Sequence, residues 1–263
     1  MSKIEPNSHA ALLDRVVEVA RSAGELVMAM YDCKSVSVQR KSDSSPVTEA
    51  DAASEDYILL ALGKLTPRIP VVSEEAASKG CIPSIADQFW LVDPLDGTKE
   101  FLNRNGEFTV NIALVENGEP VLGVVYAPAF DRLFAGRRGG GAFVEEGRTE
   151  GKRRSAIFCR KPESTIDVVA SRSHSDRAAL EAFLVGKQVR SFKFVGSSLK
   201  LCIIAIGEAD VYPRLGNTME WDIAAAHAVL AAAGGFVRTL DQSELRYGKR
   251  GFLNPHFVAS GRA

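Results

Sequence analysis

The spacing of apolar residues predicts two long helices at the start of the chain. Apolar side chains recur every three or four positions from Leu12 to Met30, which is typical of an amphipathic helix packed by one face. After a polar segment, a second helical pattern runs from Thr48 to Leu62. Thr48 and Asp51 have the spacing of a capping box, with aspartate in place of the usual glutamate. Helix capping is therefore one explanation for Asp51.

Short apolar runs separated by turn residues predict a sheet in the middle of the chain. Asn117-Gly118 is the strongest short signal for a hairpin. Gly139-Gly140-Gly141 is interpreted as a turn, because no P-loop lysine and Ser/Thr follow it. Strands are expected at Ile69–Ser73, Phe89–Val92, Phe108–Val115, Val121–Tyr126, Leu133–Phe134 and Ala142–Val144.

From Thr165 onward the pattern alternates between strands and helices, which predicts an α/β arrangement. The basic stretch Lys152-Arg153-Arg154 before it is interpreted as a solvated linker. We therefore expect two parts, an α+β part at 1–160 with an antiparallel sheet and an α/β part at 161–263. The expected strands are Ile166–Ala170, Val189–Val195 and Val211–Tyr212, and the expected helices are Ala178–Val185, Ser197–Ile206 and Ile223–Ala233.

Composition narrows the class of protein. The chain has 263 residues, of which 46% are hydrophobic and 25% charged, as in ordinary globular proteins. A net charge of −1 argues against a nucleic-acid or membrane-surface binder. No run approaches the ~20 apolar residues of a membrane span, and charges interrupt the N-terminal region too often for a signal peptide. The scattered cysteines fit a reducing cytoplasm; they are Cys33, Cys81, Cys159 and Cys202.

Acidic residues that follow predicted strands are the candidate chemistry. The stretch from Asp93 to Thr98, DPLDGT, places two carboxylates at the end of a strand, and Glu74 follows another strand. Carboxylates held close together repel each other unless one is protonated or a cation lies between them, and Mg²⁺ prefers such oxygen ligands. A turn without chemistry also explains the motif, since Asp and Gly favour turns. Asp222, at the start of an Ala-rich helix, is either an N-cap or a third carboxylate at the same site.

Four segments, VTEAD, VVSEE, DPLDGT and WDIAAAHAVLAAAGG, resemble in order and spacing the inositol-monophosphatase-like family of Mg²⁺-dependent, lithium-sensitive phosphatases. Lys99-Glu100, GSSLKLC and ADVYPRLG are similar to the CysQ-type 3′(2′),5′-bisphosphate nucleotidases within that family. The resemblance implies a layered αβαβα sandwich, as in fructose-1,6-bisphosphatase, with the site at the junction of the halves.

The resemblance also implies residue roles. Two or three Mg²⁺ ions would bind, with Asp93 bridging two of them. The expected metal ligands are Glu74, Asp93, the Leu95 carbonyl, Asp96 and Asp222. The expected catalytic residues are Asp51, Thr98 and Glu74, with Asp51 and Thr98 positioning or deprotonating the attacking water. The expected substrate contacts are Gly97, Thr98, His174, Gly196, Ser197, Lys200 and Arg214.

Lys200 and Arg214 suit a second phosphate group, because both are hydrogen-bond donors without acceptor capacity. Inositol monophosphatases typically carry glutamate where Arg214 falls. Lys200 as a surface helix residue and His174 as a loop or capping residue remain alternatives. The residues that contact adenine are not identified.

The expected reaction is Mg²⁺-dependent hydrolysis of adenosine 3′,5′-bisphosphate to AMP and phosphate, in sulfur assimilation. An inositol or related sugar phosphatase is the nearest alternative, and a non-catalytic nucleotide-binding regulator is another. A haloacid-dehalogenase phosphatase is excluded, because Pro94 stands where the DxDGT motif has its nucleophile. The expected location is the cytoplasm, with peripheral association at the inner membrane known for some relatives. Monomer and homodimer both remain open.

Overall fold

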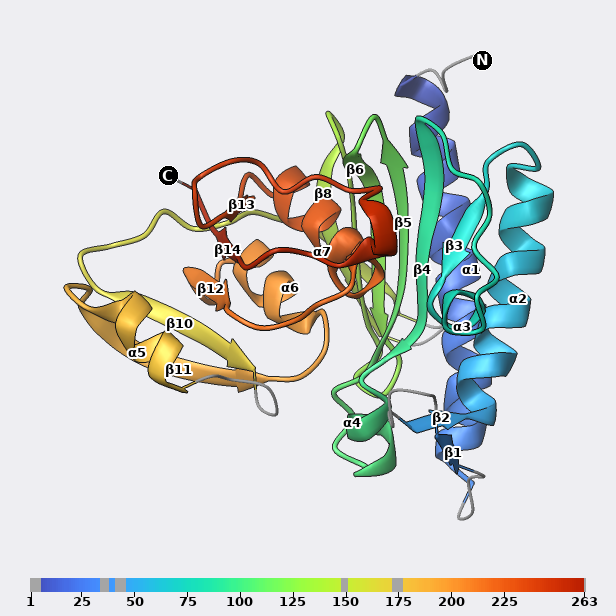
Figure 1. The fold of residues 1–263 in the computed structure, drawn as a ribbon, viewed down its shortest axis with the longest axis horizontal. Coiled ribbons are helices and arrows are strands. Elements are labelled where there is room, and N and C mark those ends of the chain that lie inside the picture. The colour runs from blue at the N-terminus through green and yellow to red at the C-terminus, as the bar shows by residue number, and fades with distance from the viewer. Residues whose placement is uncertain (1–5, 34–37, 41–45, 148–150, 172–176, 263) are drawn as a thin grey trace.

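The computed structural model describes residues 6–33, 38–40, 46–147, 151–171 and 177–262. In these ranges helices and sheets alternate in an αβαβα sandwich, as predicted (Figure 1). The helices are α1 (Pro6–Tyr31), α2 (Glu49–Leu65), α3 (Glu74–Ser78), α4 (Thr98–Leu102), α5 (Arg177–Leu184), α6 (Leu199–Ala205) and α7 (Glu220–Ala232), with a 3₁₀ turn at Arg250–Phe252.

The strands fall into two large sheets and one small pair. The pair is β1 (Val38–Arg40) with β2 (Pro46–Thr48). The first sheet contains β3 (Val71–Ser73), β4 (Gln88–Asp96), β5 (Thr109–Glu116), β6 (Glu119–Ala127), β7 (Arg132–Arg137), β8 (Gly141–Glu146) and β9 (Arg153–Ile157). The second contains β10 (Ile166–Ser171), β11 (Val189–Val195), β12 (Val211–Arg214), β13 (Phe236–Thr239) and β14 (Phe257–Ser260).

The first sheet follows chain order from β3 to β9, and only its β3–β4 pair is parallel. The hairpin signal is confirmed, since Asn117 and Gly118 both have positive φ, at 51° and 76°. Helices α1 and α2 cover one face of this sheet and α7 covers the other (Figure 1).

The second sheet has the order β11-β10-β12-β14-β13. The predicted alternation is confirmed in its parallel part, β11-β10-β12. Strands β13 and β14 were not predicted and run antiparallel.

The interpretation of Lys152-Arg153-Arg154 as a solvated linker is wrong. Arg153 and Arg154 belong to β9, the edge strand of the first sheet. The Arg154 guanidinium donates to Glu145 at 2.7 Å and to Asp14 at 3.2 Å. Charged side chains are common on edge strands because they discourage pairing with another chain, so the basic run marks an edge.

Helix α7 lies unusually close to the first sheet, although it comes from the second half of the chain. A Cβ added at Gly123 in β6 would overlap the Ala225 carbonyl oxygen and lie 2.8 Å from the Ala228 methyl group. One buried cluster contains Val125 and Phe134 of the first sheet together with Val229 of α7 and Tyr212 of the second sheet. The two parts therefore share a core, and a boundary near residue 160 stays a prediction.

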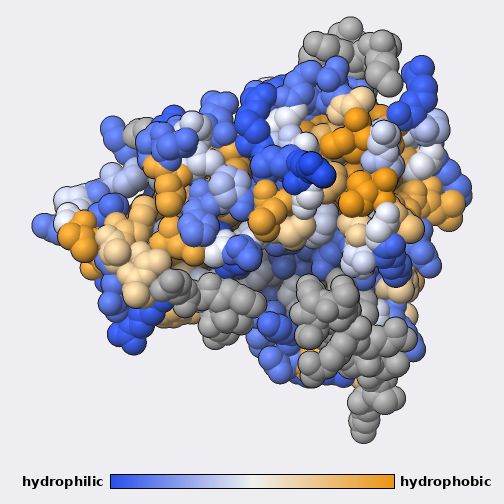
Figure 2. Space-filling model, viewed as in Figure 1, coloured by the Kyte–Doolittle hydropathy of each residue, from blue (hydrophilic) through white to orange (hydrophobic). Residues whose placement is uncertain are grey.

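The surface is mixed in polarity. Apolar patches are interspersed with hydrophilic side chains on the face that Figure 2 shows. None of the helices in the described ranges is long and apolar enough to cross a membrane. All four cysteines are free thiols; Cys33 and Cys81 are exposed, whereas Cys159 and Cys202 are buried.

We expect Gly123→Ala to lower the free energy of unfolding by about 1–3 kcal/mol, because the added methyl group overlaps α7. Gly63→Ala in α2 is the control, since nothing lies within 4 Å of a Cβ there. That variant should gain about 0.5–1 kcal/mol, because alanine favours helix more than glycine does. Urea denaturation measures both, and equal changes would contradict the close packing of α7.

Candidate active site

The predicted acidic motif forms a bulge at the end of β4. The strand continues to Asp96, so the prediction that it ends at Val92 is wrong. Asp93 pairs with Asn111 and Asp96 with Thr109, which gives β4 one residue more than β5 over this interval. Residues three apart on a regular strand point to opposite faces. The extra residue cancels this alternation, and both carboxylates can serve the same side of the sheet.

Backbone contacts fix this bulge. The Leu95 N–H donates to Asp93 Oδ1 at 3.1 Å, and the Ser54 hydroxyl donates to the Pro94 carbonyl at 2.9 Å. Gly97 follows with φ of 94°, and a Cβ there would lie 3.0 Å from the Glu107 carbonyl oxygen. A glycine is required at this position for both reasons.

Asp51 caps helix α2 and also contacts Thr98. Its Oδ2 accepts hydrogen bonds from the Thr48 N–H at 2.7 Å and the Thr48 hydroxyl at 2.6 Å, which confirms the capping box at the start of α2. Its Oδ1 accepts the Thr98 hydroxyl at 3.3 Å. The Thr98 hydroxyl also lies 3.4 Å from the Leu95 carbonyl oxygen. The predicted pair, Asp51 and Thr98, is therefore in contact.

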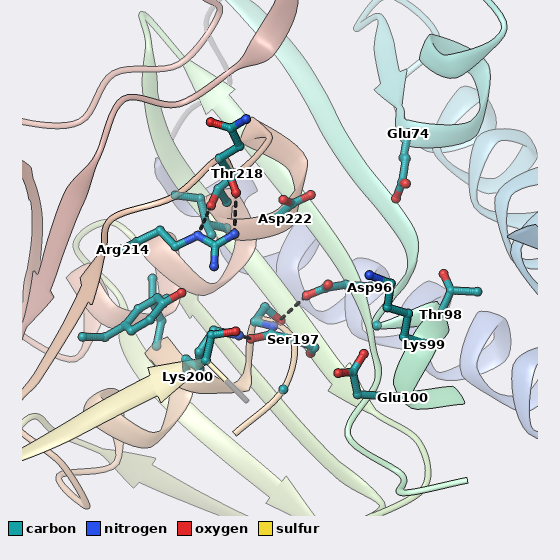
Figure 3. A pocket seen from close by; sticks show the side chains of 18 residues that line it. Glu74, Asp96, Thr98, Lys99, Glu100, Ser197, Lys200, Arg214, Thr218 and Asp222 are labelled. Carbon is teal, nitrogen blue, oxygen red and sulfur yellow. Dashed lines mark hydrogen bonds between the residues drawn. The ribbon is translucent and has the colours of Figure 1, made fainter. Parts of the chain in front are cut away.

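Four carboxylates from three segments of the chain share one electrostatic environment. Burial raises the pKa of Asp93 well above its usual value, and the charges of Glu74, Asp96 and Asp222 raise it further. Burial raises the pKa of Asp96 to about 6, although Lys200 opposes that rise. The pKa of Asp222 is also raised, first by burial and then by Asp96 and Glu74. Figure 3 shows Glu74, Asp96 and Asp222 arriving from different parts of the ribbon.

This donor set fits a hard divalent cation. Oxygen ligands suit Mg²⁺, and a cation would favour the ionised form that burial disfavours here. As placed, no three His, Cys, Asp or Glu side chains of the described ranges converge tightly enough to hold an ion. Backbone donors hold two of the acids: the Ser198 N–H bonds Asp96 Oδ2 at 2.7 Å, and the Met219 N–H bonds Asp222 Oδ2 at 2.8 Å.

Of the two alternatives for Asp222, the helix N-cap is wrong. Helix α7 begins at Glu220 after Met219, and Asp222 is its third residue. The Asp222 carboxylate instead reaches back to the Met219 N–H. Glu220 is fully buried and accepts the Gly248 and Lys249 N–H groups, which ties the start of α7 to the following loop.

A cavity of about 310 Å³ lies beside the acids. Predicted residues from both halves line it: Glu74, Asp96, Gly97, Thr98, Gly196, Ser197, Lys200, Arg214 and Asp222. Asp51, Asp93 and Leu95 are buried and do not line it. His174 lies outside the described residues.

Two cationic side chains line the same cavity as the acids. Lys200 is only 8% exposed, so its interpretation as a surface residue is wrong. Burial lowers its pKa to about 8, opposed by the charge of Asp96. Its Nζ donates to the Ser197 carbonyl and lies 5.6 Å from the centre of the Tyr212 ring. Arg214 ends β12 and donates to the Thr218 hydroxyl and the Asn217 carbonyl (Figure 3).

Several residues of this site were not among the predicted ones. Glu100 is almost buried and lines the cavity, and Tyr212 and Thr218 line it as well. Ser198 supplies the N–H that holds Asp96. The motif GSSLK contains Ser198, but a sequence does not show which of two adjacent serines faces an acid 102 positions away.

Comparison with known proteins agrees with this geometry. The profile of the inositol monophosphatase family matches residues 10–261. The 3′(2′),5′-bisphosphate nucleotidase CysQ of Escherichia coli K12 is 46% identical over 251 residues, covering 95% of this chain and 99% of that protein. CysQ of Buchnera aphidicola is 42% identical and covers 95% and 93%.

Solved structures give the same result. The crystal structure of CysQ from Bacteroides thetaiotaomicron has a TM-score of 0.79 at 35% identity and covers 96% of this chain and 98% of that chain. The IMPase of Thermotoga maritima has a TM-score of 0.77 at 27% identity, covering 95% and 92%. The chain belongs to the inositol monophosphatase family, whose phosphatases are metal dependent.

Proposed function

We propose that this protein hydrolyses adenosine 3′,5′-bisphosphate to AMP and inorganic phosphate. One observation carries the proposal: a single cavity is lined both by the carboxylates Glu74, Asp96 and Asp222 and by the cations Lys200 and Arg214. The acids suit metal-assisted cleavage of one phosphate group, and the cations suit binding of a second. The CysQ relatives named 3′(2′),5′-bisphosphate nucleotidases support the same substrate.

We assign the metal ligands as the sequence suggested. Two or three Mg²⁺ ions would be held by Glu74, Asp93, the Leu95 carbonyl, Asp96 and Asp222, with Asp93 between two of them. When bound, Mg²⁺ neutralises phosphate charge and promotes ionisation of water.

The remaining chemistry belongs to the chain itself. The Thr98 hydroxyl donates its proton to Asp51, so its lone pairs are available to accept a hydrogen bond from the attacking water. When Thr98 accepts a proton from the water, it would pass its own hydroxyl proton to the Asp51 carboxylate. Glu74 is the third proposed catalytic residue. The Gly97 and Thr98 N–H groups would hold phosphate oxygens.

Substrate binding would use the second half of the chain. Lys200 and Arg214 would pair with the 5′-phosphate, and Gly196, Ser197 and His174 would complete the contacts. Burial makes Lys200 a stronger partner for an anion, because solvent screens its charge less.

The same proposal places the protein in the cytoplasm, in the turnover of this nucleotide during sulfur assimilation. Its four unpaired thiols are compatible with a reducing compartment.

The substrate assignment is tested by measuring phosphate release from adenosine 3′,5′-bisphosphate and from inositol 1-phosphate, each with Mg²⁺. We expect the nucleotide to have the higher kcat/KM, because only it offers a second phosphate to Lys200 and Arg214. Faster turnover of the inositol ester would refute the assignment. Binding of the nucleotide without phosphate release would show a non-catalytic binding protein instead.

The metal assignment predicts that Asp93→Asn abolishes phosphate release while the fold persists. The variant loses the charge placed between two cations, yet it also relieves repulsion among buried acids, so its thermal midpoint should not fall. Asp56→Asn makes the same chemical change on the exposed side of α2 and should retain activity. Normal activity in Asp93→Asn would overturn the ligand assignment.

The raised pKa of Asp96 predicts a pH-dependent loss of stability in the metal-free protein. A carboxyl group with a pKa of about 6 in the folded protein and an ordinary value of 3.8 binds more protons when folded. The stability that the Asp96 carboxyl contributes to the folded protein is fully present below about pH 4 and is lost as the pH rises through 6. Metal-free wild type should therefore lose thermal stability relative to Asp96→Asn across this window.

Adding Mg²⁺ at pH 7 should restore more stability to the wild type than to Asp96→Asn, since the cation replaces the missing protons. Calorimetry with and without Mg²⁺ measures both effects. A constant difference between the two proteins from pH 4 to 7 would contradict the prediction.

A further inference from the structure

The turn at Gly196-Ser197-Ser198 is fastened to the start of β5. The Gly196 N–H donates to Glu107 Oε2 at 2.8 Å, and the Ser197 hydroxyl lies 2.8 Å from the Thr109 hydroxyl. Ser197 has φ of 51°, which is uncommon for a serine. These contacts hold its side chain at the wall of the cavity.

A line of hydrogen bonds leads from Ser197 into the core. Thr109 bonds the Ser198 hydroxyl at 2.9 Å, and the Ser198 hydroxyl donates to Asn111 Oδ1 at 2.8 Å. Thr109, Ser198 and Asn111 are each at most 2% exposed. Ser197 and Ser198 line the cavity and Thr109 and Asn111 do not. The Ser198 hydroxyl is taken up by Thr109 and Asn111, so the inner hydroxyls act on a ligand through Ser197.

The direction of these bonds follows from counting protons. Each hydroxyl has a single proton to donate. Ser198 donates its proton to Asn111, so it accepts from Thr109, and Thr109 in turn accepts from Ser197. In this arrangement the Ser197 proton points inward, and only lone pairs face the cavity.

The amide of Asn111 can reverse this direction. Its Nδ2 is buried and has no hydrogen-bond partner among the described residues. A half-turn of the amide would bring Nδ2 to the Ser198 hydroxyl and leave the amide oxygen without that partner. Each orientation satisfies one amide atom and not the other, so neither is strongly favoured by the protein alone. With Nδ2 donating, Ser198 donates to Thr109, Thr109 donates to Ser197, and the Ser197 proton is free to face the cavity.

We propose that Asn111 is a positioning residue whose amide orientation switches the Ser197 hydroxyl between acceptor and donor, and that a bound substrate phosphate selects the donor state. A phosphate oxygen only accepts hydrogen bonds, so it favours the outward direction. Without substrate, water can either donate to Ser197 or accept from it, so both directions remain available. The inference rests on the proposed function, because it assigns Ser197 to a substrate phosphate.

Asn111→Asp tests this switch when it is assayed at a pH at which the new buried carboxyl is ionised, since an ionised carboxylate only accepts and would hold all three hydroxyls inward. The new charge also repels phosphate, but this repulsion is the same when Ser197 has been changed to alanine. Measured with adenosine 3′,5′-bisphosphate, Asn111→Asp should raise KM about tenfold more in wild type than in Ser197→Ala, the effect of one hydrogen bond to a charged group. If Asn111→Asp raised KM by the same factor in the wild type and in Ser197→Ala, the proposal would be overturned.

A second pair of variants, at Thr109, tests the hydrogen-bonded connection between Ser197 and Ser198 if Asn111→Asp does not fold. Thr109→Val cuts the line and leaves Ser197 unoriented, whereas Thr109→Ser keeps the hydroxyl. We expect KM to rise about threefold in Thr109→Val with little change in kcat, and to return toward wild type in Thr109→Ser. The same KM in both variants, at matched thermal midpoints, would overturn the proposal. Absence of phosphate release from the wild type would instead refute the proposed function.

Discussion

Mutual repulsion among Glu74, Asp93, Asp96 and Asp222 is the constraint on which this site depends. Three of these carboxylates accept a hydrogen bond from a backbone N–H group. Leu95 donates to Asp93, Ser198 donates to Asp96, and Met219 donates to Asp222. Neutral donors reduce the cost of burying a carboxylate without cancelling its charge. The acids are thus oriented before any cation arrives, and their remaining charge attracts one. Such preorganisation lowers the cost of forming a metal site.

The position of Asp222 depends on packing far from the acids. Asp222 is in the first turn of α7, and α7 contacts β6 and β7 through Gly123 and Gly136. Larger residues at these glycines would push the helix away from the sheet. Because interiors are close-packed, that displacement would move Asp222 relative to β4. The shared core of the two halves therefore fixes how far Asp222 lies from the acids of β4.

Local sequence patterns were sufficient to predict most helices and strands, but not the register in which the strands pair. The acid-rich end of β4, the capping box at Asp51 and the Asn117-Gly118 turn each depend on residues within a few positions, and all three are present. The bulge that brings Asp93 and Asp96 to one side depends on β5, which no local pattern reveals. The same holds for Ser198 and Thr109, which are 89 positions apart. Arg153 and Arg154 looked like a linker because charge on an edge strand and charge in a loop give the same sequence pattern.

Burial acts on the two sides of the cavity in opposite senses. It raises the pKa of Asp96 and lowers that of Lys200, so each charged form needs the other or a ligand to stabilise it. Cations would satisfy the acids, and a phosphate group away from the scissile bond would satisfy Lys200 and Arg214. A substrate with a single phosphate would leave Lys200 and Arg214 without an anionic partner, because that phosphate must stay beside the acids for cleavage. Under the proposed function, the presence of both acids and cations in this cavity suits a substrate with two phosphate groups better than an inositol monophosphate.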